Sequence, residues 1–514
     1  MASFLFVVLL LVSFAPRLSI SLLNQEAACL HEIKLFHFDD PDNVLSDWIL
    51  KENETPCHWF GITCDRLTLS VNSINLSNAH IAGAFPSSLL CLGLPNLNFI
   101  TLANNSINST LSDDISTCQS LQYLDLSQNL LTGKLPATLP DIPHIIHIDF
   151  SGNSFSGDVP ASFGMFRTIE TIFLGQNFLD GAVPEFLGNI SSLKQLDLSI
   201  NQFLPGRIPP GLGNLTNLKL LFLTNCNLVG EIPDSLTRLK NLDHLDLSDN
   251  NLTGVVSTSL TRLTRLVVVC LSNNSLSGEL PGFGWSRMKE LRVFDASSNK
   301  LFGRIPEELC SLPLMSLNLY TNNLEGNLPR SIANSPNLME LRLFANRLTG
   351  ELPEKLGKDS PLVWLDVANN QFFGKLPESL CDNSALDSIL VEHNNFSGDI
   401  PVRLGKCRSL TRVVLDYNNF SGQVPAEFWG PTQANISFSG NPGLCKQIDG
   451  FFGCRATGKN PGHIWLLRSI VMLAGLVFVV GIIWIYRRLA CETGSSLFQA
   501  KDSEIELWHV AAKL

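Results

Sequence analysis

Large apolar residues return in a fixed pattern along most of the chain. Segments such as LDHLDLSDNNLTGVVSTSLTRL, LMELRLFANRLTGELPEKLGKD and LDSILVEHNNFSGDIPVRLGKC share the form LxxLxLxxNxLxGxxPxxL. About fifteen of these units follow one another between Val71 and Gly430. The alternation in LxxLxL predicts a short strand with leucines on one face and polar residues on the other. The body of the chain is therefore one small unit repeated many times.

A repeat of about 24 residues with this leucine spacing indicates a leucine-rich-repeat solenoid, an α/β fold with a curved parallel sheet. No single unit can bury its leucine face, so successive coils must stack. We expect the asparagine of each unit, for example Asn250, Asn346 and Asn418, to turn inward and bond backbone groups of neighbouring coils. Glycine and proline in segments such as SGDIP then shape the next turn.

Two apolar stretches outside the repeats predict how the chain meets a membrane. The first, within residues 1–23, is too short to span a bilayer and indicates a secretory signal peptide. The second, residues 469–486, is followed directly by Arg487 and Arg488, which is typical of a transmembrane helix with a stop-transfer signal. We expect a single-pass type I protein with the repeats outside the cell and a short tail, 487–514, inside.

The segment before the repeats, residues 24–70, predicts an N-terminal cap. It contains the amphipathic stretch NQEAACLHEIKLFHF, which favours a helix, the anchor Trp48, and the pair Cys57 and Cys64 in CHWFGITC. The ends of a solenoid expose its core, and disulfides are favoured outside the cell. We therefore predict that Cys57 and Cys64 form a bridge.

A second cysteine pair, Cys445 and Cys454 in CKQIDGFFGC, predicts a disulfide in a C-terminal cap and juxtamembrane segment, residues 431–468. A metal site is the alternative for these pairs, but no His or further Cys completes a four-ligand set at the right spacing, so we predict no metal. Cys29, Cys226 and Cys270 are expected to be buried free thiols, and Cys226 occupies an inward asparagine position. The cysteines at repeat turns stay unassigned: Cys91, Cys118, Cys310, Cys381 and Cys407.

Asn-x-Ser/Thr sequons are frequent outside the predicted membrane span, and a secreted domain with this many should carry N-linked glycans. The eleven acceptors are Asn53, Asn75, Asn104, Asn108, Asn189, Asn214, Asn251, Asn273, Asn395, Asn419 and Asn435.

Composition narrows the class of function. A hydrophobic content of 45% over 514 residues excludes wholesale disorder, and a net charge of −11 argues against a nucleic-acid binder. The sequence contains no GxGxxG opening a helix, no GxxxxGK[ST], no HExxH and no GxSxG. Residues 487–514 are too few for a folded catalytic domain. We therefore expect a binding protein without a cofactor, and no enzyme.

At closer range the chain resembles a known family. The LxGxxP form is similar to the plant-specific class of these repeats, and the phrases CHWFGITC, LTNCNLVGEIP, RVFDASSNKLFGRIP and FSGNPGLC resemble the HAESA and HAESA-like plant receptor kinases over residues 22 to 486. The resemblance implies a plasma-membrane receptor that binds a small secreted, hydroxyproline-containing peptide of the IDA type along its concave face. It also implies a co-receptor kinase of the SERK group as a partner.

The resemblance carries over two binding sites, each only in part. The family's hydroxyproline pocket is formed by an exposed Glu and by backbone near a Phe and a Ser, which correspond here to Cys270, Phe294 and Ser316. Losing the charged acceptor would remove a hydrogen bond of about 1.5–3 kcal/mol. The family's Arg-x-Arg pair for the peptide carboxylate is here Arg412 followed by Val414, one charge in place of two.

Other outward positions of the repeats predict an aromatic and polar stripe that could line a peptide groove. Its members are Phe222, Asp246, Asp295, Asn318, Tyr320, Arg342 and Phe344. Compared with the family, several repeats before the closing cap and the kinase are missing. Our leading interpretation is a kinase-less receptor-like protein or decoy. A gene fragment without a ligand and an extracellular inhibitor or scaffold protein stay open as alternatives.

Overall fold

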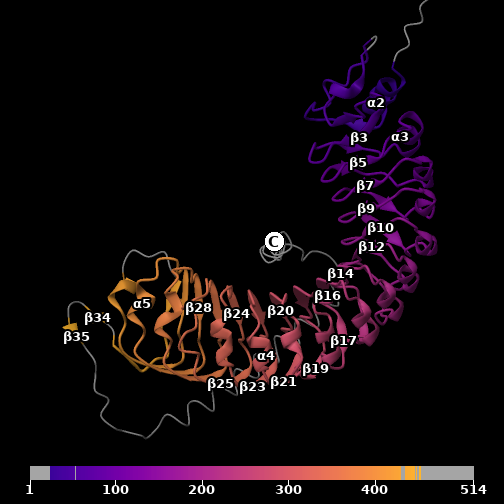
Figure 1. Ribbon diagram of the computed structural model, residues 1–514. Coiled ribbons are helices and arrows are strands. Elements are labelled where there is room, and N and C mark those ends of the chain that lie inside the picture. Colours follow the sequence, from indigo (N-terminus) through magenta and orange to yellow (C-terminus); the bar gives the residue numbers. More distant parts are fainter. Residues whose placement is uncertain (1–23, 52–53, 430–434, 446, 449–450, 453–514) are drawn as a thin grey trace, which may run out of the picture. The chain divides into compact units, whose positions relative to one another are not determined.

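The computed structural model describes residues 24–51, 54–429, 435–445, 447–448 and 451–452, which belong to one compact unit. Figure 1 shows this unit as coils that follow one another in sequence order. Each coil contributes a strand to one long sheet, crosses to the other side of the solenoid, and returns through a short helix. The leucine-rich-repeat solenoid predicted from the sequence is confirmed.

The long sheet runs through all the coils. The first strand, β2, pairs antiparallel with β3, and every later pairing is parallel between consecutive coils up to β32. Its strands are β2 (Ile62–Cys64), β3 (Val71–Asn75), β5 (Phe99–Thr101), β7 (Tyr123–Asp125), β9 (His147–Asp149), β11 (Thr171–Phe173), β13 (Gln195–Asp197), β14 (Leu220–Phe222), β16 (His244–Asp246), β18 (Val268–Cys270), β20 (Val293–Asp295), β22 (Ser316–Asn318), β24 (Glu340–Arg342), β26 (Trp364–Asp366), β28 (Ser388–Leu390), β30 (Arg412–Val414) and β32 (Asn435–Ser437).

Shorter strands form parallel sheets where each coil turns away from the long sheet. They are β4 (Ala82–Gly83), β6 (Ser106–Ile107), β8 (Thr132–Gly133), β10 (Ser154–Gly157), β12 (Phe178–Leu179), β15 (Val229–Glu231), β17 (Asn251–Thr253), β19 (Ser277–Glu279), β21 (Lys300–Arg304), β23 (Asn323–Asn327), β25 (Arg347–Gly350), β27 (Gln371–Gly374), β29 (Asn395–Gly398), β31 (Asn419–Gln423) and β33 (Gly443–Cys445). β1 (Phe38–Asp39) adds an antiparallel pairing with β4, and β34 (Gln447–Ile448) and β35 (Phe451–Phe452) form a separate antiparallel pair.

Short helices complete the coils, and most begin directly after the proline of the repeat, whose fixed φ suits a helix start. The α-helices are α2 (Gln25–Phe36), α3 (Ser87–Gly93), α4 (Glu307–Cys310) and α5 (Val402–Gly405). The 3₁₀ helices are η1 (Pro56–His58), η2 (Asp113–Thr117), η3 (Leu139–Asp141), η4 (Ala161–Met165), η5 (Glu185–Asn189), η6 (Pro210–Asn214), η7 (Asp234–Arg238), η8 (Thr258–Arg262), η9 (Trp285–Arg287), η10 (Arg330–Asn334), η11 (Glu378–Cys381) and η12 (Ala426–Trp429).

The inward asparagines close each coil, as the repeat pattern predicted. The Asn250 amide donates to the carbonyls of Leu223, Leu247 and Ser248 at 2.8, 3.1 and 2.9 Å. Its oxygen accepts from the backbone N–H groups of Cys226 and Leu228 at 3.0 and 2.9 Å. One side chain thus pairs five backbone groups that the turn would otherwise leave buried and unpaired. The same pattern continues beyond residue 430, where the Asn441 amide donates to Leu415 at 2.9 Å.

The first coil has Ala79 at this position, and Cys226 is a second exception to the pattern. Its thiol donates to the carbonyl of Leu198 at 3.2 Å, in the direction that an asparagine amide would take. Sulfur is a weak acceptor and cannot replace the amide oxygen. The position therefore keeps only part of the bonding that Asn250 provides one coil later.

The N-terminal cap covers the first coil. Helix α2 begins after Asn24, whose side chain accepts from the N–H groups of Glu26 and Ala27. Trp48 is fully buried, stacks on Trp59 at 5.9 Å, and donates from Nε1 to the carbonyl of Phe60 at 3.0 Å. Together these contacts seal the leucines of the first repeat from water.

Three disulfides connect described cysteines. Cys57 bonds Cys64 in the cap. The sequence left the other two unassigned: Cys91 bonds Cys118, and Cys381 bonds Cys407, each joining adjacent coils. Cys29, Cys226, Cys270 and Cys310 are buried free thiols. The predicted partner of Cys445, Cys454, lies outside the described residues, so that bridge stays a prediction.

The predicted signal peptide, transmembrane segment and tail also lie outside the described residues. Among the helices that the structure does describe, none has the length and apolar content needed to cross a membrane.

We predict that Asn250→Ala destabilises the solenoid by at least about 3 kcal/mol, because five buried backbone groups lose a partner. The measurement is urea unfolding of the full chain followed by circular dichroism. Asn323→Ala, which removes an exposed asparagine directly after an inward one, is the matched control and should change stability by less than about 0.5 kcal/mol. Equal losses in both variants would contradict the role assigned to Asn250.

Candidate functional site

Each strand of the long sheet presents two residues away from the core. In β22, Leu317 is fully buried between the sheets, whereas Ser316 and Asn318 point to the opposite face. We call the surface formed by the first and third residue of these strands, with the side chains that directly follow them, the concave face. Its chemistry is set by positions that the stacking of coils does not constrain.

The stripe predicted from the sequence is continuous on this face. The third strand residues are neighbours in the parallel register, in the order Phe222, Asp246, Cys270, Asp295, Asn318 and Arg342. Tyr320 and Phe344, which follow the strands, stack at 4.4 Å with their rings nearly parallel. The structure therefore brings the predicted residues together, one coil after another.

A polar network crosses three strands in the middle of the stripe. The Ser316 hydroxyl donates to Glu340 Oε2 at 2.7 Å, and Glu340 Oε1 lies 2.6 Å from Arg342 Nε. The Arg342 guanidinium lies over the Trp364 ring, 4.5 Å from its centroid, a cation–π geometry. Glu340 and Trp364 were missed from the sequence, although both precede an inward leucine and so occupy outward strand positions.

Several polar atoms near this network have no hydrogen-bond partner among the described residues. They are the side-chain oxygen of Asn318, the indole N–H of Trp364 and one carboxylate oxygen of Glu392. Buried polar atoms are normally paired, so each of these has unused bonding capacity, which a ligand or water could satisfy once a small side-chain movement opens access to it. The three atoms come from strands β22 and β26 and from the residues just after β28.

The three positions that correspond to the family's hydroxyproline pocket have different environments. Phe294 lies in the core, in edge contact with Trp285 at 5.1 Å, as its inward leucine position predicted. Only its backbone borders the concave face. Ser316 faces outward and is held by Glu340. Cys270 is buried between the neighbouring positions Asp246 and Asp295, and burial raises the pKa of its thiol well above the usual value.

The candidate carboxylate site has one cation. Arg412 is exposed at the start of β30, and Val414 occupies the other outward position of that strand. Asp366 lies two coils earlier, and burial raises its pKa to about 6, while Arg342 and Arg412 act in the opposite direction. Burial likewise raises the pKa of Asp295 to about 6. The charge of this face therefore changes in mildly acidic solution.

An aromatic row near the N-terminal end of the concave face was not predicted. Phe99 stacks on Tyr123 at 4.4 Å, Tyr123 on His147 at 4.0 Å, and the edge of Phe173 meets His147 at 6.0 Å. Burial lowers the pKa of His147 to about 4, so the ring is neutral at physiological pH. The signal was present in the sequence, because three of these residues occupy the same repeat position.

The predicted glycosylation sites and the possible metal ligands can also be placed on the structure. The ten described sequon asparagines are all exposed, and Asn53 lies outside the described residues. In the described part of the chain, no group of three or more His, Cys, Asp and Glu side chains is arranged to hold a metal ion.

Comparison with known proteins agrees with this geometry. The profile of the leucine rich repeat N-terminal domain matches residues 23–65. The leucine rich repeat profile matches six segments: 120–142, 192–215, 217–239, 241–263, 290–312 and 361–383. In Arabidopsis thaliana, the receptor-like protein kinase HSL1 is 53% identical over 100 residues, and receptor-like protein kinase 5 is 45% identical over 109 residues. These matches span 20% and 21% of this chain but only 10% of each relative.

Solved structures give a longer match. The Arabidopsis receptor kinase HAESA, crystallised with the peptide hormone IDA and the co-receptor SERK1, is 46% identical, with a TM-score of 0.77 over 82% of this chain and 73% of that chain. A TDR receptor is 31% identical, with a TM-score of 0.67 over 71% of this chain and 63% of the other. On the strength of the HAESA match in both sequence and fold, this chain belongs to the HAESA and HAESA-like family of plant leucine-rich-repeat receptors.

Proposed function

We propose that this chain is a plasma-membrane receptor-like protein that binds a small secreted, hydroxyproline-containing peptide through its concave face. The observation that carries the proposal is the continuous polar and aromatic row from Phe222 to Arg342. The proposal is supported by the fold shared with HAESA, whose solved structure contains the peptide hormone IDA. The alternation of apolar core and polar outward residues places this row on the concave face, outside the leucine core.

The chemistry of the row suits an extended peptide. An extended chain carries unpaired backbone N–H and C=O groups, which need partners when they leave water. The oxygen of Asn318 and the indole N–H of Trp364 supply one acceptor and one donor. The proton of the Ser316 hydroxyl is used by Glu340, so its lone pairs can accept from a ligand hydroxyl. The stacked rings of Tyr320 and Phe344 offer a flat apolar surface for a proline ring.

A co-receptor kinase of the SERK group is the proposed partner. The support is the HAESA crystal structure, which contains SERK1 beside the peptide hormone. We also propose that Arg412 binds the C-terminal carboxylate of the peptide. It would do so with a single guanidinium group, whereas the family uses two.

The direct test is calorimetric titration of the full chain with a hydroxylated IDA-type peptide. We expect saturable heat at micromolar peptide, because the face keeps the polar network and loses two of the family's charged contacts. Arg342→Ala should weaken binding by about tenfold, the equivalent of one charged hydrogen bond. Arg347→Ala, an exposed arginine on β25, is the control. Absence of heat at high micromolar peptide would refute peptide binding.

Restoring the family's charges should raise the affinity. Val414→Arg completes the fork that binds a carboxylate in two bonds, and we expect a gain of about tenfold. Val414→Lys adds only a point charge and should gain less. Cys270→Glu restores the missing acceptor, but it also adds a carboxylate between Asp246 and Asp295. Its gain should therefore be smaller and should grow in acidic buffer. Unchanged affinity in all three variants would show that the residues are wrongly mapped.

Peptide affinity should rise as the pH falls through about 6, the pKa of Asp366. Above that pH the ionised carboxylate opposes a peptide carboxylate at Arg412, whereas below it the group is neutral and the peptide carboxylate, with a pKa near 3.5, stays charged. If the Asp366 and peptide carboxylates lie roughly 10 Å apart, their repulsion changes Kd by about threefold. Asp366→Asn should remove most of this dependence, because Asp295, which also has a pKa of about 6, lies farther from Arg412 along the sheet. Asp359→Asn, an exposed carboxylate elsewhere, should keep it. The same slope in Asp366→Asn as in the wild type would exclude Asp366 as its origin.

A further inference from the structure

One flank of the solenoid concentrates positive charge on a chain whose net charge is −11. The charge lies in the four short segments that lead from the 3₁₀ helices η6 to η9 into strands β14 to β20. Only two acidic residues, Asp243 and Glu290, share these segments with eight basic ones. We call this surface the basic flank, and its basic residues are Lys219, Arg238, Lys240, Arg262, Arg265, Arg287, Lys289 and Arg292.

The stacking of coils turns these residues into regular rows. Arg238, Arg262 and Arg287 are the last residues of η7, η8 and η9. The strands that follow them, β16, β18 and β20, are parallel neighbours in register. The three arginines therefore recur once per coil, each ahead of a strand that lies about 4.8 Å from the next.

Most of this charge is not used by the fold. Arg238, Arg262 and Arg287 are exposed, and within the described residues none of them forms an ion pair. The Arg265 guanidinium donates to the amide oxygen of Asn241 at 2.7 Å. Of the acidic residues, Asp243 is already held by His244 at 2.7 Å. Crowded like charges repel one another and oppose folding. A bound anion would relieve this repulsion, and the unpaired arginines are available to bind one.

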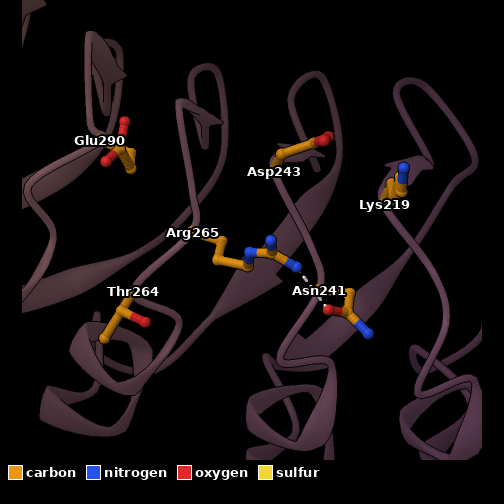
Figure 2. Close-up of a pocket in the computed structure, with 6 residues that line it drawn as sticks. All are labelled: Lys219, Asn241, Asp243, Thr264, Arg265 and Glu290. Atoms are coloured by element: carbon orange, nitrogen blue, oxygen red, sulfur yellow. Dashed lines mark hydrogen bonds between the residues drawn. The ribbon is translucent and has the colours of Figure 1, made fainter.

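The flank also contains a shallow polar hollow of about 450 Å³. Figure 2 shows Lys219 and Asp243 at corresponding places on adjacent coils, Arg265 on the next coil reaching toward Asn241, and Glu290 on the coil after that; Thr264 completes the lining. The lining contains no aromatic or large apolar side chain. Folded protein partners usually need such an anchor at the centre of an interface, so a hydrophilic, charged ligand fits this surface better.

The sequons leave the arginine row uncovered. Asn189 and Asn214 end η5 and η6, the same place in the two preceding coils. Glycans there would stand at the border of the flank. The next two sequons, Asn251 and Asn273, lie beyond the long sheet, at β17 and at the turn after β18. The segments that carry the row, 238–243, 262–267 and 287–292, contain no sequon.

From these observations we propose that the basic flank binds a linear acidic polysaccharide with a carboxylate on each sugar, laid across successive coils. A periodic polyanion matches a periodic row of cations, and arginine binds carboxylates through two parallel hydrogen bonds. The proposal shares only the extracellular location with the proposed function, because the flank and the concave face use different residues.

The test is fluorescence anisotropy of the full chain with a labelled oligogalacturonate. The variant Arg262→Glu with Arg287→Glu should bind at least about tenfold more weakly, because each change removes an attraction and adds a repulsion. The matched control is Arg304→Glu with Arg347→Glu, which changes charge equally on exposed residues of β21 and β25. It should stay within about threefold of the wild type. Arg262→Gln with Arg287→Gln removes the two positive charges without adding negative ones, so it should show an intermediate loss of binding. This pair keeps the test valid if the glutamates disturb folding.

Three outcomes would overturn the proposal: no binding by the wild type, equal loss in the flank variant and the control, or binding of poly-glutamate or heparin at least as tight as that of oligogalacturonate. Titration with the IDA-type peptide separates this site from the concave face. The flank variant should keep the peptide affinity of the wild type, whatever that affinity is. Loss of peptide binding in the flank variant would show that the two surfaces are not independent.

Discussion

The inward asparagine amide is the interaction on which the stacking of most coils depends. Each coil leaves its strand through a tight turn, and at that turn the backbone of Asp249 and of Asn273 adopts a positive φ. The turn leaves carbonyls pointing into the core, where water cannot reach them. The amide of Asn250 takes up three of these carbonyls and returns an oxygen to the coil before. This bonding lets the leucines of adjacent coils meet with the strands in register, and the coil of Cys226 keeps the register with part of it.

The register of the strands in turn determines which outward residues are neighbours on the concave face. Asp295 lies beside Asn318, and Asn318 beside Arg342, because the inward Phe294, Leu317 and Leu341 stack in one line. This much followed from the sequence, since the repeat fixes which residues turn inward. The contacts between outward side chains did not follow. Whether Glu340 reaches Ser316, Arg342 or both depends on its rotamer, and the repeat pattern carries no information about rotamers.

The disulfides likewise could be predicted from the sequence only in part. Cys57 and Cys64 are close in sequence and share one cap, so their bridge could be predicted from spacing. Cys91 and Cys118 are 27 residues apart, and Cys381 and Cys407 are 26 apart. Both separations are slightly longer than one repeat, which places the partners on adjacent coils. Spacing could have suggested these pairs, but Cys310 has the same kind of position and stays free, so spacing alone does not decide.

Because the repeat fixes only the inward residues, each outward surface of the solenoid can acquire its own chemistry at little cost to the fold. Asp246 on the concave face and Arg262 on the flank belong to one repeat unit, yet they lie on different elements, β16 and η8. A carboxylate in place of Cys270, or an arginine in place of Val414, would change one face and leave the core leucines as they are. The same freedom explains how a strongly basic row can exist on an acidic protein. The stacking of coils aligns the side chains at equivalent repeat positions. A basic residue that recurs at one such position therefore forms a linear array of charges.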